Sequence, residues 1–330
     1  MSTTRKNHHR RIAALAALSA ATLALAACGE DSEASTDGLT PLSVALFPAA
    51  DVAPVYLAIE QGFFEDEGLD VSVQMLDSGA AATAAVVSGD VNIGFSNPAS
   101  VVIARSQNLP VTIVAPASAA GDTPEDAYSG VLVQADSDIE DITDLEGRTV
   151  AVNALGNILE ITLRHALDDA GVDSSTVELV EIPFPEMPAT LEAGHVDAIF
   201  EVEPFVTQTV QTGTARVVAT PYELTAPALT GAVYFSNEQF LGENAEDAAA
   251  FRRAMEQSVA YADEHPDEMR AQVAEFTEIA PETIDEMNFA QLATDVPREM
   301  IELYADLLTQ YGLVESEVDI DALMAGLETE

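Results

Sequence analysis

The sequence is poor in basic residues and has a single cysteine, and each shortage excludes a class of function. Among 330 residues, 12 lysines and arginines stand against 57 aspartates and glutamates, which gives a formal net charge of −45. A surface this acidic repels nucleic acid, because binding depends on neutralising phosphates, and it offers no basic patch for anionic lipid. One cysteine can form neither an intrachain disulfide nor a zinc site built from several cysteines. We therefore expect no nucleic-acid partner and no metal.

The sequence also lacks the residues of common catalytic centres. Its only lysine is Lys6, so Schiff-base chemistry is not available to the rest of the chain. A glycine-rich phosphate loop of the GxxxxGK kind is absent, which argues against an ATP site. His165, His195 and His265 each stand alone, without a cysteine or an HxxxH partner. We expect a protein that is not an enzyme, with no catalytic residue and no cofactor.

The first 27 residues have the pattern of a secretory signal peptide. Basic residues lie at positions 5–11, an uncharged stretch covers 12–27, and Leu25-Ala26-Ala27 precedes Cys28. The stretch is shorter than the roughly 20 residues that a helix needs to cross a bilayer. The run up to Cys28 resembles the bacterial lipobox, which implies that its thiol is lipidated. A plain signal peptide followed by a chance cysteine is the alternative.

Residues 28–40 are expected to form a flexible tether, because the run after the cysteine is polar, acidic and without an apolar period. The mature protein is then an exported bacterial lipoprotein, outside the cytoplasm and anchored to the cell membrane by its N-terminal lipid. Arg10-Arg11 also admits the twin-arginine export route, although residues 12–14 match it poorly.

Beyond the tether, the order strand, polar loop, helix occurs repeatedly in two segments. Strands are predicted at 43–47, 70–76, 91–95, 111–115, then 149–153, 177–182, 197–201, 216–220, and finally 231–236. That order builds parallel sheets whose loops gather at the carboxyl edge of the strands, where open α/β sheets bind ligands. We predict an α/β fold in which residues 41–135 and 228–330 form lobe 1 and residues 136–227 form lobe 2. The chain would cross twice between them, with a helical C-terminal segment on lobe 1.

Four motifs stand in order along this part of the chain. They are APVYLAIEQGFFEDEGLDV at 53–71, SGDVNIG at 88–94, DLEGRTVAV at 144–152, and EAGHVDA at 192–198 followed by EPF at 203–205. Together they resemble solute-binding proteins of the nitrate/sulfonate/taurine class, whose superfamily also holds thiamine-pyrimidine-precursor binding proteins. The similarity covers about residues 42–240, with Asn92 where an aspartate is more usual.

The resemblance implies a two-lobed periplasmic-binding-protein fold of type II. Such a protein closes on a small molecule by a hinge motion and delivers it to the permease and ATPase subunits of an ABC importer. We expect the chain to act there as a monomer.

The loops after the predicted strands supply the candidate ligand-binding residues. Several of these loops open helices, whose free N–H groups and positive dipole end accept an anion or a polar oxygen. The candidates are Phe47, Asp51, Ser78, Gly79, Ser96, Asn97, Ser118, Asn153, Gly156, Asn157, Glu201 and Glu203. For the serines at 78 and 96 and the asparagine at 157, ordinary helix N-capping is the alternative role.

The two glutamates have alternative roles as well. Glu203 precedes Pro204 and either caps the following helix or contacts ligand. Glu201 ends an apolar strand, so we expect it to point at the cleft or into solvent. A cleft with carboxylates and no arginine suits a ligand that carries an amine, amide or ring N–H, such as an aminosulfonate, although neutral donors alone can hold anions.

The ligand class stays open between two alternatives. A small polar molecule of the sulfonate, taurine or nitrate class is the first, and a thiamine pyrimidine precursor or other heteroaromatic is the second. A pyrimidine synthase of the same fold is less expected, because its chemistry resembles a pyridoxal-phosphate lysine adduct and the chain after Lys6 has no lysine. A surface receptor without a transport role is a third class.

The acidic composition predicts that salt stabilises the protein. Four of the 12 basic residues precede Cys28 and all 57 acidic residues follow it, so the net charge of the chain from Cys28 onward is −49. Because salt screens the repulsion between like charges, the melting temperature should rise from dilute buffer to molar potassium chloride. Thermal unfolding followed by circular dichroism measures this, and equal melting temperatures in both solutions would contradict it.

Overall fold

The computed structural model describes residues 38–328 apart from residues 77 and 278. The expected signal peptide, Cys28 and most of the expected tether therefore lie outside the described residues. The first strand begins at Thr40, so the tether can extend no further than residue 39. Among the residues described, no helix combines the length and apolar character that crossing a membrane requires.

The first sheet has six strands in the order β11-β4-β10-β3-β1-β2. Its strands are β1 (Thr40–Leu46), β2 (Leu69–Met75), β3 (Ile93–Ser96), β4 (Val111–Ala119), β10 (Thr230–Asn237) and β11 (Gln291–Leu292). β1 pairs in parallel with β2 and β3, whereas β10 runs antiparallel between β3 and β4. The predicted return strand at 231–236 is therefore confirmed as a member of this sheet.

The second sheet has five strands in the order β7-β6-β8-β5-β9. They are β5 (Ser129–Gln134), β6 (Thr149–Val152), β7 (Glu178–Glu181), β8 (Ala198–Val202) and β9 (Ala215–Ala219). β5 was missed in the sequence, and the boundary expected between residues 135 and 136 wrongly assigned it to lobe 1. It pairs antiparallel with β8 and β9, and five of its six residues are buried. Its short apolar run, residues 131–133, lies inside the second sheet, between β8 and β9.

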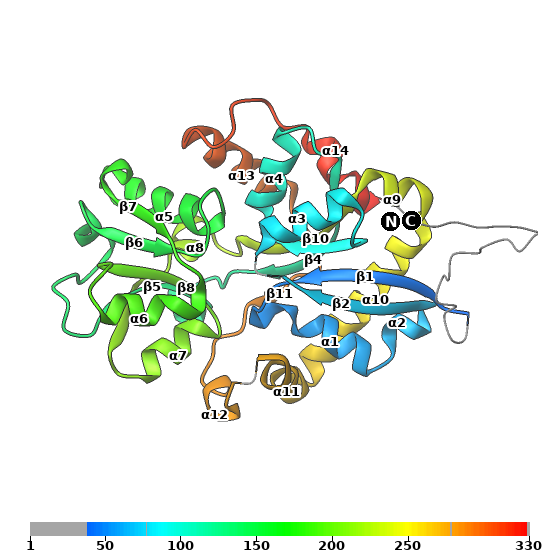
Figure 1. The fold of residues 1–330 in the computed structure, drawn as a ribbon, viewed down its shortest axis with the longest axis horizontal. Helices are drawn as coiled ribbons and strands as arrows, with labels where there is room; N and C mark the ends of the chain where they lie inside the picture. Colours follow the sequence, from blue (N-terminus) through cyan, green and yellow to red (C-terminus); the bar gives the residue numbers. More distant parts are fainter. Residues whose placement is uncertain (1–37, 77, 278, 329–330) are drawn as a thin grey trace, which may run out of the picture. The chain divides into compact units, whose positions relative to one another are not determined.

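Helices cover both sheets, as Figure 1 shows. In this view α6 and α7 lie below the strands of the second sheet, on the side away from α5. The helices up to the return strand are α1 (Ala53–Glu60), α2 (Phe63–Asp66), α3 (Gly79–Ser88), α4 (Pro98–Ser106), α5 (Ile158–Asp169), α6 (Met187–Glu192), α7 (Phe205–Gln211) and α8 (Pro221–Thr225). The remaining helices are α9 (Glu238–Glu243), α10 (Ala245–Glu264), α11 (Pro266–Thr277), α12 (Pro281–Ile284), α13 (Arg298–Gln310) and α14 (Ile320–Met324).

The helical C-terminal segment packs mainly on the first sheet, as expected, and it also reaches the second. α10 packs on α1 and its Phe251 ring stacks on Phe64 of α2, with centroids 5.5 Å apart. α13 contacts both α4 and α5, and just after it the Tyr311 hydroxyl donates to Asp168 Oδ2 at 2.9 Å. The two lobes are thus held together by more than the two crossing segments.

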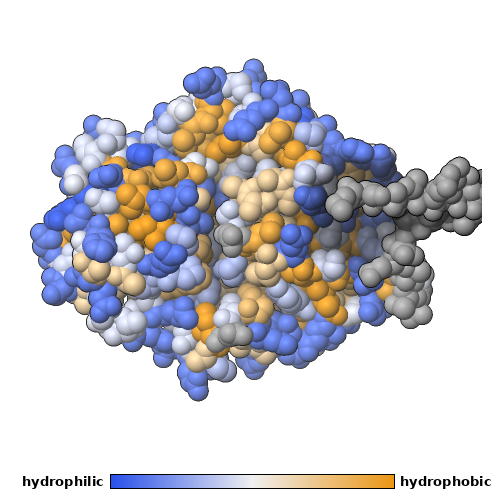
Figure 2. Space-filling model, in the orientation of Figure 1, coloured by the Kyte–Doolittle hydropathy of each residue, from blue (hydrophilic) through white to orange (hydrophobic). Residues whose placement is uncertain are grey.

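The surface agrees with the acidic composition. Figure 2 shows hydrophilic residues around much of the visible face, with apolar residues gathered in patches between them. The buried side chains are overwhelmingly apolar, and one hydrophobic cluster includes residues of both lobes, from Val101 on α4 to Leu159 on α5. Apolar side chains of the two lobes therefore pack against each other in this conformation.

Candidate ligand-binding site

A cavity of about 40 Å³ lies between the two sheets and is lined from both sides. From the first sheet and its loops come Phe47, Ala49, Asp51, Asn97, Gly231 and Ala232. From the second sheet, its loops and helices come Tyr128, Asn153, Asn157, Ile158, Leu159, Phe184, Val202 and Tyr222. Most of these positions follow the carboxyl end of a strand or open a helix, so the cavity lies where the fold predicts a ligand.

Five of the twelve predicted residues line this cavity. They are Phe47, Asp51, Asn97, Asn153 and Asn157. Ser118 stands directly behind them, because its buried hydroxyl donates to Asp51 Oδ2 at 2.6 Å. The remaining six do not line it.

Four of those six have structural roles. Ser78 caps α3 by accepting from the Ala81 amide at 3.3 Å. Ser96 is fully buried beneath Gly79, where a Cβ would lie 2.2 Å from the serine Oγ, so that glycine permits close packing. The amide of Gly156 donates to Glu160 Oε2 at 2.8 Å. These four positions therefore do not line the cavity in this conformation, and ligand contact at them stays a prediction.

Glu201 points neither at the cavity nor into solvent, contrary to both expectations. It is fully buried, and neither carboxylate oxygen has a hydrogen-bond partner among the described residues. Because Val202 faces the cavity, the alternation along β8 turns Glu201 to the other face of the sheet, toward Thr209 of α7. Burial raises the pKa of Glu201 to about 8, the Thr209 hydroxyl opposes that rise, and the charge of Glu203 adds to it.

Glu203 has the capping role. Its Oε2 accepts from the Thr207 amide at 3.0 Å and its Oε1 accepts from the Thr207 hydroxyl at 2.7 Å. Its backbone joins the lobes, because its N–H donates to the Tyr128 carbonyl and its carbonyl accepts from the Ala50 N–H of the first lobe. Burial raises the pKa of Glu203 to about 7, against the hydrogen bonds from Thr207.

Two asparagines at the cavity both cap helices. Asn97 Oδ1 accepts from the Ser100 amide at 3.0 Å at the start of α4. Asn157 Oδ1 accepts from the Leu159 amide at 3.0 Å, and its Nδ2 donates to Asn153 Oδ1 at 2.8 Å. The Nδ2 of Asn97 has no partner among the described residues, so this donor stays available to a ligand.

Two tyrosines complete the site and were missed in the sequence. Tyr128 and Tyr222 pack edge to face, with ring centroids 5.7 Å apart. Tyr128 lies directly before β5, so finding β5 would have pointed to it. Gly231 faces the first tyrosine, since a Cβ there would lie 2.2 Å from the Tyr128 Oη and 3.2 Å from the Ser118 Oγ. Aromatic rings and hydroxyl groups therefore share one wall of the cavity.

The cavity is small, and the only charged side chain in its described lining is a carboxylate. About 40 Å³ accommodates ordered water, whereas pockets for organic ligands usually measure about 300–1000 Å³. Binding of a ring or a sulfonate therefore requires the two sheets to separate. Asp51 is the only carboxylate in the described lining, and that lining contains no arginine, lysine or histidine.

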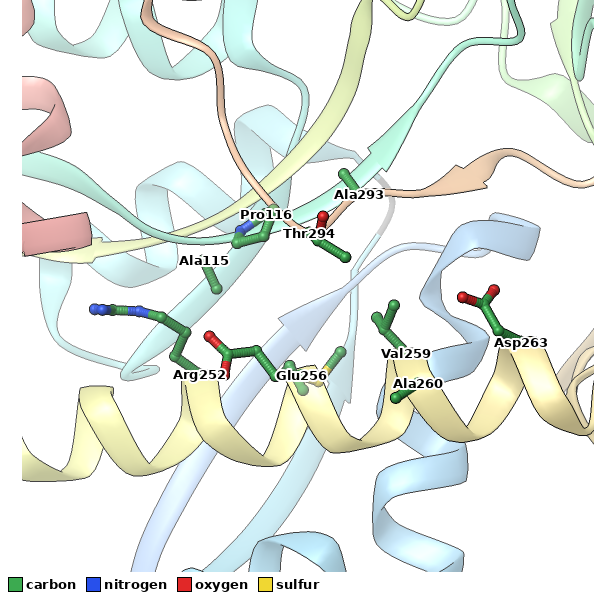
Figure 3. A pocket seen from close by; sticks show the side chains of 10 residues that line it. Ala115, Pro116, Arg252, Glu256, Val259, Ala260, Asp263, Ala293 and Thr294 are labelled. Carbon is green, nitrogen blue, oxygen red and sulfur yellow. The ribbon is translucent and has the colours of Figure 1, made fainter.

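A larger cavity of about 160 Å³ lies elsewhere, between α10 and the segment 115–116 of β4. Figure 3 shows the guanidinium of Arg252 pointing away from Thr294 and Asp263 across this cavity. That guanidinium donates to the carbonyls of Val114 and Gly326, at 2.9 and 2.7 Å. No loops from the two sheets meet here, so we take the cavity between the sheets as the candidate site. Among the described residues, no cluster of His, Cys, Asp and Glu could hold a metal ion.

Comparison with known proteins gives the family. The profile described as NMT1/THI5 like matches residues 49–269. The chain belongs to the NMT1/THI5-like family. This confirms the resemblance seen in the motifs.

Relatives in this family carry names of two kinds. The chain is 29% identical over 254 residues to the formylaminopyrimidine-binding protein of Halalkalibacterium halodurans, covering 75% of this chain and 74% of that one. It is 26% identical over 218 residues to the 4-amino-5-hydroxymethyl-2-methylpyrimidine phosphate synthase of Aspergillus parasiticus, covering 63% and 62%. The family therefore contains proteins named for binding and proteins named for catalysis.

Solved structures confirm the fold. The alkanesulfonate-binding protein SsuA from Xanthomonas axonopodis pv. citri, bound to MOPS, superposes with a TM-score of 0.74 at 16% identity. The match covers 88% of this chain and 99% of that one. The predicted two-sheet periplasmic-binding-protein architecture is confirmed.

Packing at Gly231 generates a first prediction about the site. Gly231→Ala should destabilise the protein by about 1–3 kcal/mol, because the added methyl must displace the buried Tyr128 hydroxyl. Gly242→Ala in α9 is the control, since nothing lies within 4 Å of its Cβ position. Urea unfolding measures both, and an unchanged midpoint for the Gly231 variant would contradict the described packing.

Burial of Glu201 generates a pH-dependence prediction. The folded protein keeps this proton up to pH of about 8, whereas the unfolded chain releases it near its ordinary pKa of 4.5. Because the unfolded state binds fewer protons between these values, the free energy of unfolding should fall as the pH rises through this window. Glu201→Gln cannot titrate and should show a shallower fall.

The control for this comparison is Glu192→Gln, at an exposed position on α6. Its pH profile should follow that of the wild type. Chemical unfolding of all three proteins across the window measures the slopes. A Glu201→Gln slope equal to that of the wild type would refute the role of this carboxyl.

Proposed function

We propose that this chain is the extracytoplasmic solute-binding subunit of an ABC importer and captures a small polar organic molecule between its two sheets. The observation that carries the proposal is the cavity lined from both sheets, with the helix-capping residues Asn97 and Asn157 on opposite sides. Membership in the NMT1/THI5-like family and the SsuA-like fold support it. Permease and ATPase subunits would be its partners, and it would act as a monomer.

The proposed domain organisation follows from the strands. Among the described residues, 40–119 and 230–328 form the first lobe, 129–225 form the second, and the segments 120–128 and 226–229 cross between them. Residues 1–27 are the signal peptide, and Cys28 carries the lipid that anchors the protein to the membrane. A ligand that contacts both lobes shifts the population from open to closed.

Two ligand classes have support from particular observations. The N-termini of α4 and α5 favour an anionic or acceptor group, such as that of a sulfonate or nitrate. The tyrosine wall and Asp51 favour a heteroaromatic ring with N–H donors, such as a thiamine pyrimidine precursor. The formylaminopyrimidine-binding relative supports the second class.

Binding without catalysis is part of the proposal, although one relative is named as a synthase. The described cavity lining contains no lysine, cysteine or histidine, the side chains that most often act as nucleophile or base. The side chains that do line it are suited to recognition. Asparagines, tyrosines and one carboxylate supply hydrogen bonds to a ligand.

A thermal-shift panel tests the proposed ligand classes. The panel contains taurine, nitrate, alkanesulfonates, formylaminopyrimidine and 4-amino-5-hydroxymethyl-2-methylpyrimidine. A true ligand at 100 times its Kd stabilises the protein by about 2.7 kcal/mol and raises the melting temperature. If no compound shifts the melting temperature, the proposed classes are wrong.

Substitutions of Asn97 distinguish its role as a helix cap from a role in ligand recognition. Asn97→Asp keeps the capping oxygen and replaces the donor Nδ2 by an acceptor. We expect an unchanged urea midpoint and an affinity about tenfold lower for the ligand found in the panel, equivalent to about 1.4 kcal/mol. Asn97→Ala, which also loses the cap, should lose affinity and about 0.5–2 kcal/mol of stability. Unaltered affinity in Asn97→Asp would assign this residue to capping alone.

A further inference from the structure

Asp51 is a buried carboxylate that faces the cavity without a cation. The exposed fraction of Asp51 is 8%. The one hydrogen bond described for its side chain is donated by the Ser118 hydroxyl. Burial raises the pKa of Asp51, and the hydrogen bond from Ser118 opposes this rise only in part. A buried charge costs free energy unless it is paired, so a positive or donor group brought by a ligand would compensate that cost.

Hydroxyl groups surround this carboxylate but do not neutralise it. Tyr234 is fully buried, and its hydroxyl has no partner among the described residues. Burial first, and the charge of Asp51 second, raise the pKa of both Tyr128 and Tyr234. The surroundings of Asp51 are therefore polar and negatively charged. No arginine, lysine or histidine of the described cavity lining competes with a ligand for this carboxylate.

The position of Asp51 is fixed by regular structure. It lies in the short helix at Ala50–Val52 that follows β1, and Ser118 lies near the end of β4. The backbone N–H of Ala50 donates to the carbonyl of Glu203 across the lobes at 3.4 Å. A carboxylate held this way is preorganised, so little ordering entropy is lost when a ligand binds.

We propose that Asp51 determines the specificity of the cavity by requiring an N–H donor or an ammonium group on the ligand. This inference rests on the proposed function. The asparagine-capped helix N-termini of α4 and α5 receive the acceptor end of the ligand, and Asp51 receives the donor end. Bifunctional molecules such as aminosulfonates and aminopyrimidines are accepted. Nitrate and simple alkanesulfonates are rejected, because they place an acceptor against a carboxylate.

The other buried glutamates do not serve this purpose. Glu201 is turned to the far face of β8, and both oxygens of Glu203 are engaged by Thr207. Asp51 is thus the one carboxylate of the described cavity lining that can discriminate between a donor and an acceptor. A binding site that donates to or accepts from a particular ligand group rejects analogues without that group. The polar group of the protein would otherwise stay buried without a hydrogen-bond partner.

Matched ligand pairs test the inference. Isothermal titration compares taurine with ethanesulfonate, and 4-amino-2-methylpyrimidine with 2-methylpyrimidine, on the wild type, Asp51→Asn and Asp173→Asn. Asp173 is the matched control, because its exposed carboxylate also accepts from a serine hydroxyl, that of Ser175 at 2.6 Å. In the wild type and the control, the amine-bearing member of at least one pair should bind at least about tenfold tighter. In Asp51→Asn, that ratio should fall close to one.

A second variant keeps the test informative if Asp51→Asn folds poorly. Ser118→Ala leaves the carboxylate in place but removes its hydrogen bond, so the position of Asp51 becomes less defined. We expect a selectivity ratio between those of the wild type and Asp51→Asn. Circular dichroism and the urea midpoint establish that each variant is folded.

The outcomes distinguish this inference from the proposed function. Equal or tighter binding of the members without an amine would overturn the role of Asp51 and leave the solute-binding function in place. A selectivity ratio in Asp51→Asn equal to that of the wild type would do the same. Failure of every compound in both the pairs and the earlier panel would overturn the proposed ligand classes, and the inference with them.

Discussion

The hydrogen bond from Ser118 to Asp51 fixes the one carboxylate in the described lining of the cavity. It shows one of two ways in which this chain accommodates a buried carboxylate, the other being the ion pair of Glu160 with Arg164 at 2.8 Å. Glu203 is held in the first of these ways, by the hydroxyl and amide of Thr207. The composition explains the choice of partner, because eight arginines must serve 57 acidic residues after Cys28. A hydroxyl donates a hydrogen bond but brings no positive charge, so the carboxylate keeps a net charge that only a cation or a proton can balance.

This constraint connects stability to recognition. Where the carboxylate is closed off from the cavity, as at Glu201, burial favours the protonated form and its pKa rises to about 8. Where it borders the cavity, as at Asp51, a ligand can supply the missing positive or donor group instead. The arginines with described contacts are engaged elsewhere: Arg148 pairs with Asp138 at the surface, and Arg252 binds main-chain carbonyls. The acidic bias of the whole chain thus determines the character of the site.

The sequence predicts the parts of the fold that have clear local signals. Phe47, Asn97 and Asn157 each follow a strand at a recognisable loop, and all three line the cavity. The side on which Glu201 lies could not be predicted, because β8 is buried on both faces and its apolar run has no alternation to indicate a side. β5 was missed, and with it Tyr128, because its short apolar run has no alternation that would distinguish a strand from another buried segment. Residues whose place depends on long-range strand pairing need the structure.

Ligand entry must overcome contacts that link the two lobes on several sides. The cavity of about 40 Å³ is far smaller than an aminopyrimidine requires, so the sheets must move apart before a ligand binds. Two hydrogen bonds join the lobes and resist that movement: the Ala50 N–H donates to the Glu203 carbonyl, and on the α13 side the Tyr311 hydroxyl donates to Asp168. Because Tyr311 belongs to the C-terminal segment, this segment is part of the closed interface as well as a cover for the first sheet. Its contacts across the lobes therefore stabilise the described conformation, and the affinity measured for a ligand includes the free energy of breaking those contacts that must open for entry.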